Sequence, residues 1–325
     1  MEKAQIMSDS SGLNVLVLAG GISHERDVSL RSGRRVADAL AEAGHRVVLR
    51  DPDAGLFPYL EAERPDVVFP ALHGSSGEDG SLLELLSAIG VPTVGSTAAA
   101  ARRAWSKPVA SSLVGGAGIS VPESVVLSHE AFRELGAASV LAVVRQALEG
   151  GVVVKPGSGG SAQGVTIVED PKDLPRAMVE AFTYAEIAVV ERRILGTELA
   201  VAVVDTGDGP RVLTPVEIEP TTGVYSFEAR YNAGETTFYA PSRLDESVIA
   251  KVSDAAVLAH RTLGLRDLSR VDVIVDGDGT PWFLEANVIP GLTETSSVPL
   301  AIDASGTDAA TVYDSLVRAA HARGA

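Results

Sequence analysis

The sequence predicts an α/β protein whose N-terminal part contains a parallel β-sheet. Short apolar runs rich in Val and Leu alternate along this part with segments of helical periodicity. Consecutive strands that are separated by helices run parallel, because a tight hairpin cannot join them. Ligands of such sheets bind at the carboxyl ends of the strands, so the loops that follow the strands are the first candidate site.

Strands and helices alternate from residue 13 onward, and two of the connecting loops are polar. In chain order we expect a strand at 13–18, a helix at 31–43 ending at Gly44, strands at 46–49 and 65–71, a helix at 81–89 and a short strand at 93–94. The loops AGGISHERDVS and LHGSSGEDG follow the first and third strands, which makes Glu25 and His73 candidate site residues. Each has a simpler interpretation: Glu25 as a helix-capping acid, and His73 as a packed loop histidine.

The first loop also resembles a dinucleotide-binding loop, but its spacing opposes that interpretation. Gly20 and Gly21 are not followed by the further glycines of the GxGxxG pattern. Asp51 is the one acid near the end of the second strand that could contact a ribose. We therefore disfavour a nicotinamide-dependent enzyme.

A second unit begins near Ser96 and contains a glycine-rich loop between two strands. We expect a helix at 99–115, interrupted near Pro108, and another at 128–150. The run GVVVK ends at Lys155, and the loop PGSGGSAQG then leads to a strand at 165–168. Glycines let backbone N–H groups approach phosphate oxygens, and Lys155 adds a positive charge. A P-loop would open a helix instead, and a flexible hairpin tip is the alternative interpretation.

The third unit extends from about Glu191 to the end of the chain. Its expected elements are strands at 199–204 and 214–218, a helix at 245–263, a hairpin at 269–287 and a helix at 308–322. The segment 222–239 mixes aromatic, charged and glycine residues without clean periodicity. It is either a mobile lid over a reaction centre or a plain long loop between strands.

The predicted hairpin gathers polar side chains on one face. A two-residue loop at Gly277 and Asp278 would place Asp272 opposite Phe283. Alternation then assigns Arg270, Asp272, Glu285 and Asn287 to one face, and Val271, Val273, Val275, Trp282, Leu284 and Ala286 to the other. Two carboxylates and an amide suit a hard cation such as Mg²⁺, which takes oxygen ligands. A solvated polar face is the alternative, but the following Pro290-Gly291 turn and its Thr/Ser cluster favour a ligand site.

Composition excludes several classes of function. The chain has 325 residues, enough for two or three domains, and its 46% hydrophobic and 22% charged content is typical of globular proteins. A net charge of −16 argues against a nucleic-acid partner, although a local basic pocket for a nucleotide is compatible with it. The absence of cysteine excludes disulfides and a thiolate nucleophile and agrees with a cytoplasmic location. No apolar run approaches the ~20 residues of a membrane helix, and the polar first twelve residues do not resemble a signal peptide.

Seven motifs together resemble the D-alanine–D-alanine ligase family of the ATP-grasp superfamily. They are GGISHERDVSL, ALHGSSGEDG, VVVKPGSGGSAQGV, ERRILGTE, FEARY, SRVDV and EANVIPGLTETS, and they occur in this order across nearly the whole chain. The resemblance implies an ATP-grasp fold with three α/β domains: an N-terminal pre-ATP-grasp domain at 1–95, a central subdomain at 96–190 and a C-terminal subdomain at 191–325. It also implies that ATP binds between the second and third domains and that ADP-forming ligation proceeds through an acyl phosphate.

The same resemblance implies roles for residues that match the motifs. ATP contacts are implied for Lys107, Lys155, Ser161, Glu191, Ile194, Glu198, Arg230 and Leu284. Two Mg²⁺ ions, for which Mn²⁺ is the alternative, would be held by Asp272, Glu285 and Asn287, in agreement with the hairpin analysis.

Substrate and catalytic roles follow in the same way. Glu25 would pair with the ammonium of the first D-alanine, with His73 beside that substrate, and Ser296 would bind the carboxylate of the second. Arg270 and the Gly291 amide would stabilise the oxyanion of the tetrahedral intermediate. Tyr231, with Ser161 and Glu25, would form a hydrogen-bonded set that ties the lid to both other domains.

Five positions depart from the usual family pattern. They are Arg230 for a lysine near the γ-phosphate, Ala162 for a second serine in the glycine-rich loop, Val288 and Ile289 before Pro290-Gly291, and Ser106 for an aspartate before Lys107. Arginine keeps the charge of lysine but changes its reach and geometry. These departures affect the nucleotide and acceptor loops rather than the metal ligands.

We therefore expect an ATP-dependent ligase that makes D-alanyl-D-alanine for peptidoglycan precursor synthesis. The alternatives are a related ligase that joins other amino acids or analogues in specialised metabolism, and a non-catalytic nucleotide-binding protein. The intact set Asp272, Glu285 and Asn287 argues against the latter. Expected partners are small molecules, neither nucleic acid nor membrane, with a homodimer as a compatible assembly.

Tyr231 should determine which nucleophile is accepted. In the resembling family, tyrosine at this position accompanies an amine acceptor, and phenylalanine accompanies ligases that accept a hydroxy acid. Losing one hydroxyl from a hydrogen-bonded network should disturb it by about 1–3 kcal/mol. We predict that the wild type makes dipeptide rather than depsipeptide at neutral pH, and that Tyr231→Phe raises D-lactate relative to D-alanine incorporation. Mass analysis of products from mixed substrates measures this ratio, and an unchanged ratio in the variant would contradict the role.

Overall fold

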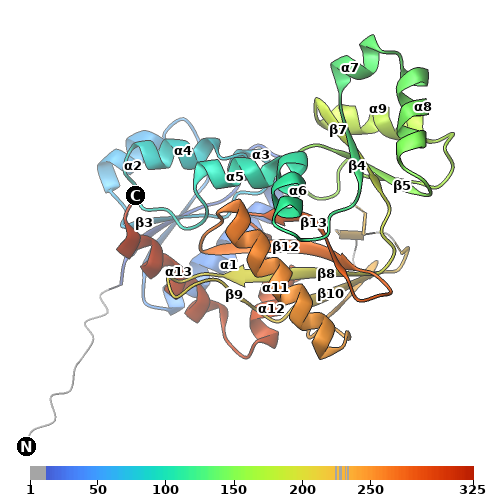
Figure 1. Cartoon of the computed structure of the whole chain (residues 1–325). Helices are drawn as coiled ribbons and strands as arrows, with labels where there is room; N and C mark the ends of the chain where they lie inside the picture. Colours follow the sequence, from blue (N-terminus) through green and yellow to red (C-terminus); the bar gives the residue numbers. More distant parts are fainter. Residues whose placement is uncertain (1–11, 224, 227–228, 231, 233) are drawn as a thin grey trace, which may run out of the picture.

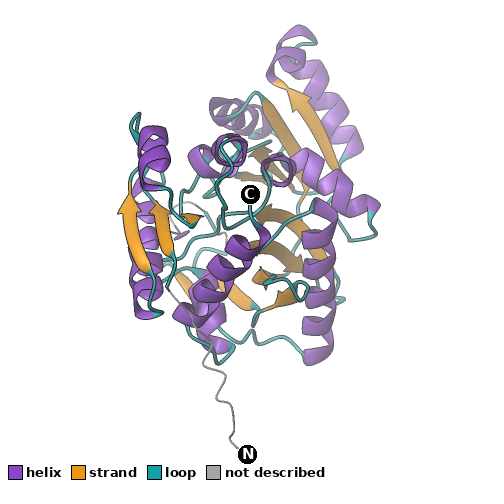
Figure 2. Cartoon of the chain, turned by 90° about the vertical axis from the view of Figure 1, so that its left-hand side faces the viewer, coloured by secondary structure: helices purple, strands orange, loops and turns teal. Residues whose placement is uncertain are grey.

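The computed structural model describes residues 12–325, except 224, 227–228, 231 and 233. Three β-sheets succeed one another along this described part of the chain, and helices pack against each of them (Figure 1). Figure 2 shows the strands lying between layers of helices. The expected α/β architecture is therefore confirmed.

The N-terminal sheet is parallel, as the sequence predicts. It has the order β2-β1-β3, and its elements are β1 (Asn14–Leu18), α1 (Arg26–Glu42), β2 (Arg46–Arg50), α2 (Leu56–Glu63), β3 (Val67–Pro70), α3 (Ser75–Glu78) and α4 (Ser81–Ala88). Val15 and Val17 of β1 enter one hydrophobic core, and Leu16 and Leu18 enter another on the opposite face. Burial on both faces explains why this strand reads as an unbroken apolar run. The expected strand at 93–94 is reduced to one bridge between Thr93 and Val68.

The middle sheet forms a separate lobe with its own helices (Figure 1). The sheet is antiparallel with the order β4-β7-β5-β6, and its elements are β4 (Ser124–Ser128), α7 (His129–Glu134), α8 (Ala137–Ala147), β5 (Val152–Pro156), β6 (Thr166–Val168), α9 (Leu174–Tyr184) and β7 (Ile187–Arg192). The expected single helix at 128–150 is wrong. Gly136 has a φ of +80°, which a continuous right-handed helix cannot contain, so two helices form instead.

The C-terminal sheet is antiparallel and provides most of the site. Its strands are β8 (Thr197–Val204), β9 (Arg211–Val212), β10 (Val216–Pro220), β11 (Thr236–Tyr239), β12 (Leu268–Val275) and β13 (Pro281–Asn287), in the order β11-β10-β8-β12-β13 with β9 beside β8. The helices α5 (Ala98–Trp105), α6 (Lys107–Gly116) and α11 (Glu246–Leu263) share a core with it. Extended backbone at Ser106 separates α5 from α6, and Pro108 falls in the first turn of α6, where proline is tolerated.

The core that Val15 and Val17 of β1 enter also joins the C-terminal part to the N-terminal sheet. Ala202 and Val204 of β8 pack in one cluster with Val15 and Phe69 of the parallel sheet. The helices α12 (Ser297–Ala304) and α13 (Ala309–Arg323) complete this cluster. The loops at the end of the parallel sheet are thereby held against the segment that follows β13. The helices α5 and α6 fall within the predicted central subdomain at 96–190, yet they pack on the C-terminal sheet. The domain boundaries at 95 and 190 therefore remain a prediction.

The hairpin at 268–287 forms with a different register from the one expected. Asp272 pairs with Glu285 rather than with Phe283, because a bulge interrupts the ladder after Asp272. The connecting loop is also longer than two residues, since Val275 pairs with Pro281. The polar pairs Arg270–Asn287 and Asp272–Glu285 nevertheless share one face, as predicted.

The bulge also corrects the expected apolar face. Phe283, not Trp282 or Leu284, joins the core beside Val271 and Val273. Trp282 pairs with Ile274, and Leu284 is left free to face a cavity. Across the described residues, no helix combines the length and apolarity needed to span a membrane.

Asp267 connects three distant segments and should contribute strongly to stability. Its side chain is 2% exposed, accepts a 2.6 Å hydrogen bond from the Gly95 amide, and pairs with Arg323 through bonds of 2.7 and 2.8 Å. Asp267→Asn keeps the shape but weakens these charge-assisted bonds, so the free energy of unfolding should fall by about 1.5–3 kcal/mol.

Urea unfolding of Asp267→Asn and of Asp53→Asn measures the difference. Asp53 is the matched control, because it pairs with Arg50 at an exposed site where such pairs contribute about 0–1 kcal/mol. Equal destabilisation by the two variants would contradict the structural role of Asp267.

Candidate active site

Two cavities adjoin where the three sheets approach one another. The first has a volume of about 420 Å³ and lies between the middle and C-terminal sheets. The second has a volume of about 640 Å³ and lies between the N-terminal loops and the segment after β13. Gly160, Ile218, Tyr225 and Arg230 line both cavities, so the two spaces meet at these residues.

Buried lysine–carboxylate pairs line the first cavity. Lys155 lies near the end of β5 and Glu191 on the neighbouring strand β7, with 2.8 Å between the ammonium and the carboxylate. Lys107, at the start of α6, lies 2.5 Å from Glu285 and donates to the Gly159 carbonyl at 2.9 Å. A carboxylate holds each ammonium at the cavity wall. A ligand with a higher negative charge could compete with that carboxylate and bind the ammonium.

The other residues expected to contact ATP also reach this cavity, apart from Ser161. Ile194, Glu198, Leu284 and Arg230 all line it. Leu284 reaches it because of the bulge in the hairpin. Burial raises the pKa of Glu198 to about 7, partly offset by Arg230.

Arg230 is a half-buried cation that faces both cavities. Its guanidinium lies 4.1 Å from the ring centroid of Tyr225. Within the described part of the chain, its buried Nε has no hydrogen-bond partner. A buried charged donor without a partner is unfavourable unless a ligand supplies an acceptor. Arg230 therefore marks the junction as a place for an anion.

The predicted metal ligands lie together on the polar face of the hairpin. Asp272 is opposite Glu285, and the Asn287 amide donates to Asp272 at 3.3 Å. Arg270 makes two 2.7 Å bonds to Asp272. Burial would raise the pKa of Glu285, but the cations Lys107 and Arg230 hold it well below its usual range. Glu285 is thus kept ionised, as a metal ligand must be.

This donor set fits a cation that takes some of its ligands from the protein and the others from a bound substrate. The described residues contain no group of three or more His, Cys, Asp or Glu side chains that could enclose a metal ion. Two carboxylates and an amide are consistent with Mg²⁺, which usually takes only one or two protein carboxylates and completes its shell with phosphate oxygens and water.

Glu25 and Ser161 meet in the second cavity from different domains. The Ser161 hydroxyl donates to the Glu25 carboxylate, as the resemblance implied for this pair. Glu25 occupies the residue before α1, but its side chain makes no capping bond, so the alternative of a helix-capping acid is not what the structure shows. Gly74, with φ +76°, allows close approach, since a Cβ there would lie 2.9 Å from Glu25. Tyr231, the third expected member, lies outside the described residues.

The opposite wall of the second cavity is the segment after β13. Gly291 and Ser296 line it, as do Arg270 and Asn287. The Ser296 hydroxyl lies 2.9 Å from that of Thr293 and accepts a 3.1 Å bond from the Thr293 amide. All residues expected to bind the amino-acid substrates therefore reach one cavity, although the roles assigned to them remain predictions.

His73 lines the second cavity but is engaged on both ring nitrogens. Nδ1 lies 3.0 Å from the Ile289 carbonyl, and Nε2 lies 3.0 Å from the Ser32 hydroxyl. Burial lowers the pKa of His73 to about 4, so the ring is neutral at physiological pH. The alternative of a packed loop histidine therefore describes its contacts.

Sequence reasoning missed Glu78, a buried acid on the same wall. Its carboxylate accepts a 3.0 Å bond from the Gly74 amide. Burial, and then repulsion from Glu25, raise the pKa of Glu78 to about 8. The polar run LHGSSGEDG contains Glu78, but nothing in that run distinguishes it from a solvated loop acid.

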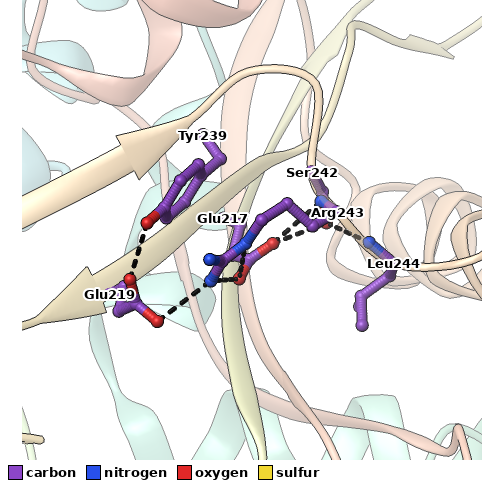
Figure 3. Close-up of polar contacts among 6 residues, drawn as sticks. All are labelled: Glu217, Glu219, Tyr239, Ser242, Arg243 and Leu244. Atoms are coloured by element: carbon purple, nitrogen blue, oxygen red, sulfur yellow. Dashed lines mark hydrogen bonds and ion pairs between the residues drawn. The ribbon is translucent and has the colours of Figure 1, made fainter.

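A polar network that the sequence did not indicate clamps the base of the predicted lid (Figure 3). The segment 221–235 connects β10 to β11, and Arg243 follows β11. The Arg243 guanidinium donates to Glu217 at 2.5 and 3.0 Å and to Glu219 at 3.0 Å. The Tyr239 hydroxyl donates to Glu219 at 2.7 Å, and its ring lies under the guanidinium. Glu217, Glu219 and Arg243 also line the first cavity, so the lid base is part of its wall.

Comparisons with known proteins agree with this geometry. A family model described as D-ala D-ala ligase C-terminus matches residues 113–318. A D-alanine–D-alanine ligase from Anaeromyxobacter sp. (strain K) is 41% identical over 295 residues, which cover 90% of this chain and 92% of that protein.

Solved structures show the same fold. The structure of the D-alanine–D-alanine ligase from Coxiella burnetii has a TM-score of 0.80 at 26% identity, covering 97% of this chain and 95% of that one. The VanG D-Ala:D-Ser ligase from Enterococcus faecalis has a TM-score of 0.79 at 26% identity, covering 95% and 99%. The predicted ATP-grasp fold and the resemblance are thus confirmed: the chain belongs to the D-alanine–D-alanine ligase family.

Proposed function

We propose that this protein joins two D-alanine molecules to D-alanyl-D-alanine and converts ATP to ADP and phosphate. The observation that carries the proposal is the junction of the two cavities at Gly160 and Arg230. One cavity is lined by buried lysines and the other by Glu25 and hydroxyl groups, so a phosphate donor and an amino acid would meet at the half-buried cation Arg230. Family membership supports the same reaction.

ATP would occupy the first cavity. Lys155 and Lys107 would release their carboxylate partners in part and bind phosphate oxygens, since both ammonium groups are almost fully buried. The glycine-rich loop at 157–164 supplies backbone donors close to them. Leu284 and Ile194 offer the apolar surface that an adenine ring needs.

Asp272, Glu285 and Asn287 would hold two Mg²⁺ ions, for which Mn²⁺ is the alternative. When bound, these ions would offset the negative charge of the triphosphate and orient it. The protein's own contribution is to keep Glu285 ionised through Lys107 and to hold Asp272 in place through Arg270.

The first D-alanine would be held by its two charged ends in the second cavity. Glu25 would accept the ammonium group, which places the carboxylate toward Arg230 at the junction. Transfer of the γ-phosphoryl group then breaks the bond to ADP and forms an acyl phosphate. This step makes the carbonyl carbon electrophilic, which a free carboxylate is not.

The second D-alanine would approach from the segment after β13. Ser296 would bind its carboxylate, and its deprotonated amine would attack the carbonyl carbon. This attack forms the C–N bond, and Arg270 and the Gly291 amide would stabilise the oxyanion that results. The oxyanion then collapses: the bond to phosphate breaks, and the leaving phosphate takes the proton that the nitrogen loses. The segment 221–235 would close over the junction and keep water from the acyl phosphate.

A related ligase with another acceptor is the second candidate. Val288 and Ile289, which depart from the family pattern, begin the acceptor segment (residues 288–296) and are both buried in the core. Ile289 also lines the second cavity, so its side chain borders the space that the acceptor would occupy. Phosphate release with ATP, Mg²⁺ and a panel of D- and L-amino acids decides between the two. We expect D-alanine to give the highest rate; a preference for another amino acid would replace the first proposal by the second.

The setting of the reaction remains part of the proposal. We propose a cytoplasmic role in peptidoglycan precursor synthesis, with the domain boundaries 1–95, 96–190 and 191–325 given above. A homodimer is a compatible assembly, and analytical ultracentrifugation would establish it.

Lys155 should contribute to nucleotide affinity rather than to amino-acid affinity. Lys155→Ala removes a buried positive charge and leaves Glu191 unpaired beside the phosphates. We expect binding of a non-hydrolysable ATP analogue to weaken by about tenfold or more, as measured by calorimetry. Lys172→Ala is the control, because Lys172 is exposed in the same lobe. Unchanged affinity in Lys155→Ala would make the loop structural.

Glu285→Gln should nearly abolish ADP formation and leave the fold intact. The substitution keeps the shape but removes a charge that the metal ions need, so the rate should fall by at least about a hundredfold. Initial rates at saturating Mg²⁺, together with thermal unfolding, test this. Glu84→Gln, at an exposed ion pair with Arg102, is the control. Full turnover by Glu285→Gln would refute the metal assignment.

A further inference from the structure

Two buried serines lie one turn apart on α1, and each joins two other segments. The Ser29 hydroxyl donates to the Ala71 carbonyl at 2.6 Å and accepts from the Gly20 amide at 2.8 Å. The Ser32 hydroxyl bonds to His73 Nε2 at 3.0 Å and accepts from the Leu292 amide at 3.1 Å. Both side chains are 0% exposed. Ser29 connects segments of the N-terminal sheet, whereas Ser32 reaches the segment after β13.

The directions of the bonds around Ser32 follow from the groups that take part. The Ile289 carbonyl can only accept, so Nδ1 of His73 carries the ring proton. In the neutral ring Nε2 is then an acceptor, and the Ser32 hydroxyl must donate to it. The hydroxyl oxygen keeps its lone pairs for the Leu292 amide. Every member is satisfied in this one arrangement.

These bonds fix the acceptor segment on both sides of Pro290-Gly291. His73 holds the carbonyl before this pair, and Ser32 holds the amide after it. Gly291 lies between them in close contact with Ser296, since a Cβ at this position would lie 2.8 Å from the Ser296 hydroxyl. The placement of the Gly291 amide and of Ser296 therefore depends on a hydroxyl of α1.

We propose that Ser32 is a positioning residue for the acceptor half of the reaction, and that His73 acts through the acceptor segment rather than by giving a proton to the substrate. The first statement rests on the proposed ligase function; the second rests on the hydrogen bonds alone. Removal of the Ser32 hydroxyl leaves two buried polar groups, His73 Nε2 and the Leu292 amide, without partners. The segment would then shift to satisfy them, and the acceptor would lose its alignment with the acyl phosphate.

The kinetic experiment compares Ser32→Ala with Ser29→Ala. Each variant removes from the same helix a fully buried hydroxyl that makes two hydrogen bonds. We therefore expect the two variants to lower the free energy of unfolding by similar amounts. We expect Ser32→Ala to raise the KM of the acceptor D-alanine by about tenfold with little change in the KM of ATP. The amount of ADP formed should also exceed the amount of dipeptide, because water hydrolyses the acyl phosphate when the acceptor is misaligned. Ser29→Ala should show neither effect.

Equal effects of the two variants, or a rise in the KM of ATP as large as that of the acceptor, would overturn the positioning role. If the wild type makes no dipeptide from D-alanine, the proposed function fails, and that failure is visible without either variant.

Nitrogen NMR of the ring tests the second statement without any substrate. In wild-type protein labelled with ¹⁵N-histidine, we expect His73 at neutral pH to be neutral with its proton on Nδ1, assigned by comparison with His73→Asn. In Ser32→Ala, Nε2 loses its hydrogen-bond donor. Its ¹⁵N resonance should therefore move toward the position of an unprotonated ring nitrogen that accepts no hydrogen bond. A proton on Nε2 in the wild type, or a charged ring, would overturn the hydrogen-bond arrangement and with it the role of His73.

Discussion

Charge compensation inside the protein is the constraint on which the site depends. The pairs Lys155–Glu191, Lys107–Glu285 and Arg270–Asp272 each bury opposite charges in close contact. An isolated buried charge is strongly unfavourable, so each partner must be supplied by the fold before any ligand arrives. Lys155 and Glu191 come from the middle sheet, whereas Lys107 crosses from α6 to the C-terminal sheet. The pairs thus supply most of the charge of the site, and the Lys107–Glu285 pair also ties α6 to β13.

Much of the architecture follows from the sequence because the relevant signals are local. Unbroken apolar runs predicted the parallel sheet, and glycines after Lys155 predicted the strand–loop–strand unit. The placement of Arg270, Asp272, Glu285 and Asn287 on one face of the hairpin was also correct, although the strand register was not. These features depend on alternation and turn chemistry, which neighbouring residues carry.

The errors arise where geometry is set by contacts distant in sequence. A bulge in the hairpin moved Phe283 into the core and Leu284 to the cavity, and strict alternation cannot reveal a bulge. Helix α12 was missed because it is short and begins within a Thr/Ser cluster that is typical of a loop. Ser32 gave no signal at all, since its partner Leu292 is 260 residues away. Loop position and alternation singled out Glu25, His73, Lys155 and the polar residues of the hairpin, and the resemblance added the remaining candidates; the roles of all of them remain predictions.

The glycine-rich loop carries two consecutive residues in the left-handed region that are not glycine. Ser161 has a φ of +53° and Ala162 a φ of +55°, and L-residues with side chains rarely adopt such values. Each stores backbone strain of order 1 kcal/mol, which the surrounding fold must oppose. A glycine at either position would remove that strain but would also multiply the conformations of the free loop. The loop thus loses some intrinsic stability but is already ordered by folding. If it binds a nucleotide, as proposed, little conformational entropy remains to be lost on binding.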